Sequence, residues 1–136
     1  MISYAKLHQP HNTDTWSFFT HLPSDMQTFL CTGNTDLRKS IDGLSMIVEK
    51  EFGLNPYSKS MYLFCGERTN LLKGLYFDGF AFVELTVRSD KIKFKWPQQD
   101  REIWKISRNI MIQLLNGNSV QKEDALRVFK RLPAES

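Results

Sequence analysis

The sequence has few cysteines and no long apolar run. These two features argue against a disulfide-rich secreted domain and against a membrane-spanning protein. Cys31 and Cys65 are the two cysteines among 136 residues, too few for the disulfide framework of a small secreted domain. No apolar stretch approaches the roughly 20 residues that cross a bilayer, and residues 1–10 lack the regions of a signal peptide. We therefore expect a soluble intracellular protein with no membrane partner, whose cysteines are reduced and buried.

Histidine is also scarce, and its positions limit the chemistry. All three histidines, His8, His11 and His21, lie near the start of the chain, so neither cysteine has a sequence-local base for nucleophilic catalysis. Their spacing fits no standard zinc pattern, and we expect no metal site and no cofactor. We interpret residues 1–26 as a polar N-terminal arm that precedes a single domain at 27–136.

The composition indicates a folded domain with a weak preference for acidic partners. Hydrophobic residues make up 41% of the chain and aromatic residues 12%, which is more than a disordered chain carries. The formal net charge is +3. A charge of this size permits binding to an acidic partner without requiring it.

Apolar runs separated by turn signals predict a β-sheet. Met61–Cys65 is almost continuously apolar, which is typical of a strand covered on both faces. Asp78 and Gly79 form a strong hairpin signal, and Pro97 ends the last run because it has no N–H to donate. We expect an antiparallel meander of about four to five strands, at Thr28–Cys31, Met61–Cys65, Leu71–Phe77, Phe80–Val87 and Lys91–Trp96.

Helical periodicity appears in three places, which makes the expected fold class α+β. The first helix, expected at Asp36–Phe52, has an apolar face that suits packing on the sheet. Gly43 in its middle indicates a close approach of the backbone, either to a neighbouring strand or to a ligand or partner. Two C-terminal helices are expected, one starting at the N-cap Ser107 and ending near Asn116, and one at Lys122–Arg131.

Positive charge is concentrated in the second half of the chain. Between Arg88 and Arg108 there are seven basic residues and three acidic ones. Lys91, Lys93 and Lys95 alternate with apolar residues, so in a strand they would share one face at intervals of roughly 6.6 Å. This row could contact a phosphate backbone or an acidic protein. The alternative is a solvated edge strand that lysines protect from aggregation.

The two expected C-terminal helices also suit a helix-turn-helix motif. In that interpretation the basic outer face of Lys122–Arg131 would enter the DNA groove. Packing of both helices against the sheet explains the same apolar positions.

A different hypothesis makes the protein a metal-dependent DNA-processing enzyme. Such an enzyme needs two or three carboxylates that converge on a divalent metal. Each candidate also has an ordinary structural role, in a helix start, a surface ion pair, a turn or a strand, so we favour a protein without catalytic residues. The candidate carboxylates are Asp36, Asp42, Asp78, Glu84 and Asp90.

Several motifs together resemble one protein family. They are Asn34–Lys39 followed by Asp42-Gly43-Leu44, then Tyr76–Phe80, then Phe94–Pro97. The chain resembles the small accessory proteins, called TnpB or second-frame products, of the sixty-six family of bacterial insertion sequences. The likeness covers about residues 28–120. It departs from the family at Glu67–Asn70 and Thr86–Ser89, where the family carries more basic residues.

The resemblance implies an accessory role in transposition beside a separate transposase that holds the catalytic acidic residues. We therefore expect a bacterial cytoplasmic protein that binds the transposase of the same element, DNA, or both, with DNA contact through a basic surface. The residues expected to contact DNA or a partner are Arg38, Lys39, Arg68, Lys91, Lys93 and Lys95. The residues of the motifs expected to have structural roles are Asp36, Asp42, Gly43, Asp78, Gly79, Trp96 and Pro97.

Overall fold

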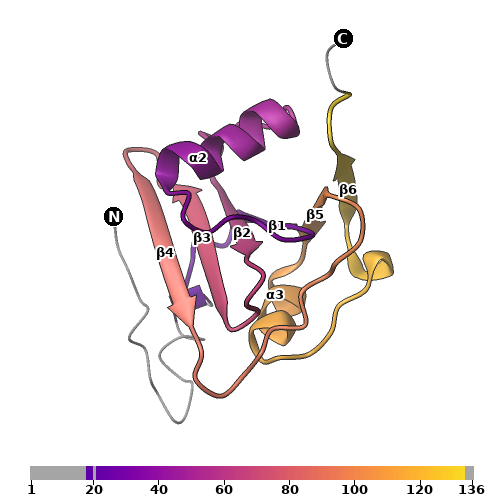
Figure 1. Cartoon of the computed structure of the whole chain (residues 1–136). Helices are drawn as coiled ribbons and strands as arrows, with labels where there is room; N and C mark the ends of the chain where they lie inside the picture. Colours follow the sequence, from indigo (N-terminus) through magenta and orange to yellow (C-terminus); the bar gives the residue numbers. More distant parts are fainter. Residues whose placement is uncertain (1–17, 20, 134–136) are drawn as a thin grey trace.

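A six-stranded sheet forms the centre of the protein (Figure 1). The computed structural model describes residues 18, 19 and 21–133. The strands lie in the order β4-β3-β2-β1-β5-β6. Their bounds are β1 Gln27–Cys31, β2 Ser60–Cys65, β3 Leu71–Phe77, β4 Phe82–Arg88, β5 Glu102–Ile106 and β6 Arg127–Lys130.

The sheet is mixed, because its two central strands run parallel. Gln27 of β1 pairs with Ser60 of β2 in parallel register, whereas all other neighbours are antiparallel. Parallel neighbours need a long crossover, and the chain supplies it through α2 (Ile41–Met46) and the π-helical turn η1 (Ile47–Glu51). The expected antiparallel meander of four to five strands is therefore wrong.

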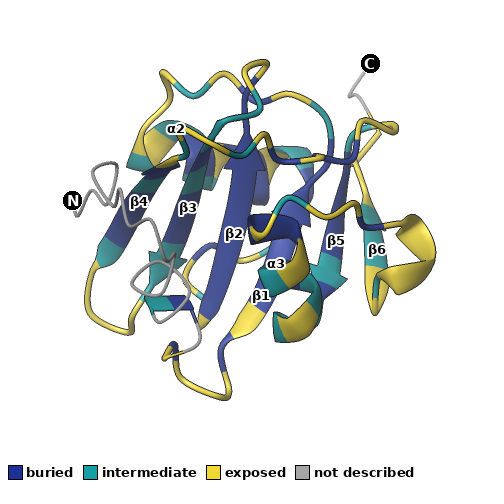
Figure 2. Ribbon diagram, turned by 90° about the horizontal axis from the view of Figure 1, so that it is seen from below, coloured by how far each residue is buried: buried dark blue, intermediate teal, exposed yellow. Residues whose placement is uncertain are grey.

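Helices cover both faces of the sheet. α2 and η1 lie across one face, and α3 (Arg108–Leu115) lies on the other (Figure 1). Six consecutive residues of β2 are buried as a result, and Figure 2 shows this strand buried along its length. The prediction that Met61–Cys65 is covered on both faces is confirmed.

Each face of the sheet has its own apolar core. Under α2 and η1 the core includes Leu44, Val48 and Phe64. On the side of α3 it includes Trp104 and Leu114. Full burial of one such side chain contributes about 1.5–3 kcal/mol, so the two cores hold the layers together.

The first helix is shorter than its sequence suggests. The Asp36 side chain accepts a hydrogen bond from the backbone N–H of Arg38 at 3.0 Å, which forms a turn, and the helix begins only at Ile41 after Ser40. The expected start at Asp36 is therefore wrong. Gly53 has φ +68° and ends the helical segment as predicted, since glycine adopts this left-handed conformation without strain.

The segment Lys91–Trp96 is not a strand, although its burial alternates as predicted. Phe94 and Trp96 are buried, whereas the three lysines are exposed. The two aromatic side chains belong to the core on the side of α3, so the segment crosses a face of the sheet. Alternation here reflects packing against a layer and not a strand ladder.

The C-terminal part differs most from the prediction. Residues Glu102–Ile106, for which no strand was expected, form β5 between β1 and β6. α3 begins after Ser107, whose side chain accepts a hydrogen bond from the backbone N–H of Ile110, as predicted. The expected helix Lys122–Arg131 is wrong, because it consists of a 3₁₀ turn, η2 (Lys122–Asp124), and β6. The helix-turn-helix hypothesis therefore loses its second helix.

The described residues before β1 contribute to the core. Phe19, Leu22 and Met26 are buried on the α3 side. Arg108 of α3 donates hydrogen bonds to the carbonyl oxygens of Leu22 and Pro23 at 2.9 and 2.7 Å. The rest of the expected arm, with His8 and His11, lies outside the described residues. Within the described part of the chain, no helix is long and apolar enough to cross a membrane.

Candidate nucleic-acid interface

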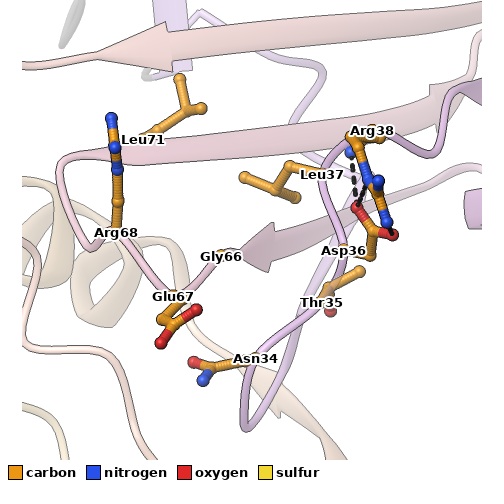
Figure 3. A pocket seen from close by; sticks show the side chains of 9 residues that line it. All are labelled: Asn34, Thr35, Asp36, Leu37, Arg38, Gly66, Glu67, Arg68 and Leu71. Carbon is orange, nitrogen blue, oxygen red and sulfur yellow. Dashed lines mark hydrogen bonds and ion pairs between the residues drawn. The ribbon is translucent and has the colours of Figure 1, made fainter.

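The carboxyl ends of β1 and β2 meet at one edge of the sheet and border an open pocket. Because these strands are parallel, the loops that follow them leave side by side, an arrangement that commonly forms ligand sites. The backbone N–H of Thr35 donates to the carbonyl oxygen of Cys65 at 2.9 Å and joins the two loops. The pocket has a volume of about 740 Å³ and is lined by Asn34, Thr35, Asp36, Leu37, Arg38, Gly66, Glu67, Arg68 and Leu71 (Figure 3).

Arg101 fixes the loop on the β1 side of this pocket. Its Nη1 donates to the carbonyl oxygen of Asn34 at 2.9 Å and to Oγ1 of Thr35 at 3.0 Å. Its Nε lies 3.3 Å from Oε1 of Glu51. The Arg101 side chain is only 16% exposed, so its charge supports the loop and is largely withheld from solvent. Sequence reasoning counted Arg101 as one surface charge and missed this role.

Arg38 lies at the rim of the pocket but is already paired. Its Nε donates to Oδ1 of Asp36 at 2.9 Å, and its Nη2 donates to Oδ2 at 2.7 Å (Figure 3). The Arg38 guanidinium holds the pKa of the Asp36 carboxyl far below its ordinary value. An anionic ligand would have to compete with this carboxylate, so Arg38 offers less positive charge than its 91% exposure suggests.

Lys39 and Gly43 pack against each other at the start of α2. A Cβ atom added to Gly43 would lie 2.9 Å from Cβ of Lys39. A close approach is therefore present at Gly43, and it involves the side chain of Lys39 in the preceding turn and not a neighbouring strand. The carbonyl oxygen of Lys39 accepts a hydrogen bond from Nζ of Lys73 at 2.9 Å, which anchors this loop to β3.

Four of the predicted contact residues lie on the β2–β3 loop or on the segment that is hydrogen-bonded to it. The backbone N–H of Phe94 donates to the carbonyl oxygen of Thr69 at 2.6 Å, and that of Ser89 donates to Asn70 at 2.8 Å. These bonds place residues 91–96, which we call the lysine segment, beside the β2–β3 loop. This loop carries the exposed Arg68. We call the four exposed cations the basic surface: Arg68, Lys91, Lys93 and Lys95.

The side chains of the basic surface are free to contact a ligand. Among the described residues, no ion pair or hydrogen bond engages any of the four cationic groups, in contrast to Arg38 and Arg101. The Ser89 hydroxyl accepts from the backbone N–H groups of Lys91 and Ile92 at 3.2 and 2.8 Å. This turn fixes the backbone from which the lysines project, so the arrangement can bind anions.

The candidate carboxylates are separated from one another. Asp36 pairs with Arg38, Asp42 is exposed on α2, and Asp78 forms the hairpin turn. Glu84 is buried with the Lys73 ammonium 3.3 Å from its Oε1. Within residues 18–133 as described, no three histidine, cysteine or carboxylate groups gather in a way that could hold a metal ion.

The remaining motif residues have structural contacts. Oδ1 of Asp78 accepts from the backbone N–H groups of Phe80 and Ala81 at 2.8 and 2.7 Å. These bonds lower the pKa of Asp78, and Gly79 in the same turn has φ +99°. Trp96 Nε1 donates to the Cys31 carbonyl oxygen at 2.8 Å. The Pro97 carbonyl oxygen accepts from the N–H of Gly33 at 2.9 Å. Trp96 and Pro97 thus tie the lysine segment to the end of β1.

Comparison with known proteins gives one family match and one curated relative. The family model described as "IS66 Orf2 like protein" matches residues 26–125. The uncharacterized protein y4hO of Sinorhizobium fredii (strain NBRC 101917 / NGR234) is 32% identical over 98 residues, covering 71% of this chain and 85% of the relative. No solved structure matches the chain.

Proposed function

Because the chain belongs to the IS66 Orf2-like family of insertion-sequence accessory proteins, we propose that it serves transposition as a non-catalytic module that binds DNA. The basic surface would contact the phosphate backbone. The transposase of the same element would carry out strand cleavage and joining in the bacterial cytoplasm, with this protein as its partner. The observation that carries the proposal is the docking of the lysine segment on the β2–β3 loop through Phe94 and Thr69.

The physical basis of the proposal is an array of unneutralised cations on a fixed backbone. Lysines and arginines that approach phosphates release condensed counterions, which makes binding strongly dependent on salt. Phosphate contacts position a protein on DNA without reading its sequence. We therefore propose binding that is largely independent of DNA sequence, with Arg68, Lys91, Lys93 and Lys95 as the principal contacts.

Arg38 and Lys39 have a smaller part in this proposal. The Asp36 carboxylate neutralises Arg38 locally, and the stem of Lys39 packs on Gly43. Arg38 lies across the pocket from Arg68 (Figure 3) and would contact only DNA that extends over the pocket mouth.

A salt titration of DNA binding tests the proposal. Fluorescence anisotropy with a labelled duplex would compare the wild type with the triple variant Lys91→Gln, Lys93→Gln, Lys95→Gln. Loss of three phosphate contacts should lower affinity at least about tenfold and reduce the slope of log K against log salt by about 2.7. Lys50→Gln, at an exposed lysine of η1 that pairs with Glu49, is the matched control and should bind like the wild type.

Two outcomes would reject the DNA contact. One is an affinity for DNA that does not change between about 50 and 200 mM salt, and the other is a triple variant that binds as the wild type does. A pull-down with the transposase, with and without nuclease treatment, separates protein contact from DNA bridging. Magnesium-dependent nicking by the purified protein that Asp42→Ala abolishes would contradict the non-catalytic assignment.

A further inference from the structure

The two edges of the sheet differ in how they are protected. β6 has four residues, and its charged terminal residues, Arg127 and Lys130, are exposed, a common protection against strand pairing. β4 forms the opposite edge, with β3 as its neighbour in the described sheet (Figures 1 and 2). It has seven residues and no proline or lysine. Among the described strands, β4 therefore forms the edge that is open to a further strand.

The register of the β3–β4 hairpin identifies the backbone groups on the outer edge of β4. The N–H of Asp78 bonds to the Ala81 carbonyl oxygen, and the N–H of Ser89 bonds to that of Asn70. Both pairs fit one register, and hydrogen-bonded pairs alternate in antiparallel strands. Val83, Leu85 and Val87 therefore bond to β3. The backbone groups that point away from β3 are those of Phe82, Glu84, Thr86 and Arg88.

A charged side chain on β4 lacks part of its hydrogen bonding. Glu84 is 2% exposed, and its Oε1 accepts no hydrogen bond. The Lys73 ammonium lies 3.3 Å from this oxygen but donates to the Lys39 carbonyl oxygen at 2.9 Å. A buried carboxylate oxygen without a donor is costly. Arg88, four residues along the same strand, is exposed and has the opposite charge.

We propose that two copies of this chain pair through their β4 strands, antiparallel about a two-fold axis, so that one continuous sheet crosses the dimer. Thr86 would lie opposite Thr86 of the second copy. This register places Glu84 opposite Arg88 of the second copy, whose guanidinium would supply the missing donor. It also brings the outward backbone groups of Glu84, Thr86 and Arg88 into hydrogen-bonding positions.

Charge complementarity selects this register. A shift that centres the pair on Leu85 also aligns outward backbone groups, but it places Glu84 opposite Thr86, so no charged donor of the second copy faces the carboxylate. Opposite charges at directly facing positions stabilise a strand pair. In the symmetric dimer, Glu84 of each copy faces Arg88 of the other copy, so the interface contains two equivalent ion pairs.

Cross-linking at the two-fold axis tests both the dimer and its register. In a hydrogen-bonded antiparallel pair the facing Cα atoms are about 5.5 Å apart, which is within disulfide range. The variant Thr86→Cys should therefore form a covalent dimer under mild oxidation. Asn109→Cys, at an exposed position of α3, is the matched control. The wild type should not cross-link, because Cys31 and Cys65 are buried.

Mass measurement on the full chain gives an independent test. Light scattering after size-exclusion chromatography should show twice the chain mass of 15.9 kDa. Thr86→Lys places two ammonium groups face to face at the axis, and we expect the dimer to weaken at least about tenfold. Asn109→Lys adds the same charge on α3 and should leave the dimer intact. Circular dichroism would verify that each variant is folded.

Defined outcomes overturn the proposal. A wild type that has the monomer mass at about 100 μM protein rejects self-pairing through β4. Thr86→Cys that cross-links no faster than Asn109→Cys rejects the register. A dimer that survives both Thr86→Lys and Arg88→Ser rejects β4 as the interface.

Discussion

Trp104 Nε1 donates a 3.0 Å hydrogen bond to Oε1 of Glu102, two residues earlier on the same face of β5. The second carboxylate oxygen, Oε2, lies 3.0 Å from Nζ of Lys122. The Glu102 side chain is only 6% exposed. Both oxygens of this buried carboxylate therefore have a donor, one from Trp104 and one from Lys122. This network makes a charged residue compatible with the start of an interior strand.

Removing the indole donor should destabilise the protein. Trp104→Phe leaves Oε1 of Glu102 buried without a donor, and we expect a loss of about 1–3 kcal/mol in the free energy of unfolding. Urea denaturation followed by circular dichroism measures it. In a double-mutant cycle with Glu102→Gln, the two losses should sum to more than the loss in the double variant. Additive losses would contradict the predicted coupling.

The stability of the protein should decrease in acid partly because of Glu102. Burial raises the pKa of this carboxyl, but the hydrogen bonds from Trp104 and Lys122 outweigh burial and bring the pKa below its ordinary value of 4.5. The stabilisation is thus fully present above about pH 4.5 and is lost as the pH falls through the lower, folded-state pKa. Urea midpoints of the wild type should drop more steeply across this window than those of Glu102→Gln. Parallel pH profiles would exclude Glu102 as a source of the acid sensitivity.

Alanine substitutions at Gly79 and Gly117 distinguish the cost of a left-handed backbone from the cost of steric overlap. Gly117 has φ +87°, and an added Cβ would lie 2.8 Å from Cγ2 of Ile92. Gly79 has φ +99° and an open surrounding. Gly79→Ala should cost about 1–2 kcal/mol for the left-handed backbone alone, and Gly117→Ala should cost more because Ile92 must move. Thermal denaturation of both variants checks the order, and equal losses would show that Ile92 yields freely.

The two cysteines should react slowly in the folded protein. Burial raises the pKa of Cys31 and Cys65 to about 12, and the thiolate is the reactive form. At pH 8 a thiol-specific reagent should modify neither residue rapidly, whereas two thiols should titrate at once in urea. Modification of the native protein at the rate of a free cysteine would contradict the buried environment of these thiols.

Local patterns in the sequence predict β3, β4 and α3 well. Each has a signal contained within a few residues, such as the Asp78-Gly79 hairpin or the Ser107 N-cap. The expectation that Cys31 and Cys65 are free and buried is confirmed. These features depend on neighbouring residues, which is why sequence reasoning could identify them.

Features that depend on distant partners could not be predicted in this way. The charged residues Glu102 and Lys105 make β5 hard to recognise as a strand. Glu102 can be buried there because it pairs with Lys122, a residue distant in the sequence. The apolar positions Ala125, Leu126 and Phe129 suit a helix, yet Leu126 is 65% exposed, and Phe129 of β6 packs edge to face against Phe29 of β1. Periodicity over so few residues does not separate a short strand from a helix.

The candidate interface was predicted only in part. Sequence alternation identified Lys91, Lys93 and Lys95 as outward residues, and they are exposed. The parallel pairing of β1 with β2, which forms the pocket beside them, joins segments about 30 residues apart. The support that Arg101 gives to Asn34 and Thr35 spans an even longer separation. Neither relationship leaves a mark on the local sequence.

The position of β1 between β2 and β5 determines when the sheet can be completed on the ribosome. Thr28 faces Met61 on one side and Ile106 on the other. At about 5–20 residues per second of synthesis, residue 106 follows residue 65 by about 2–8 seconds. During that interval the nascent chain presents an unfilled β-strand edge at its centre. Because the first strand lies in the middle of the sheet, we expect this open edge to be the part of the nascent chain that most needs protection from aggregation.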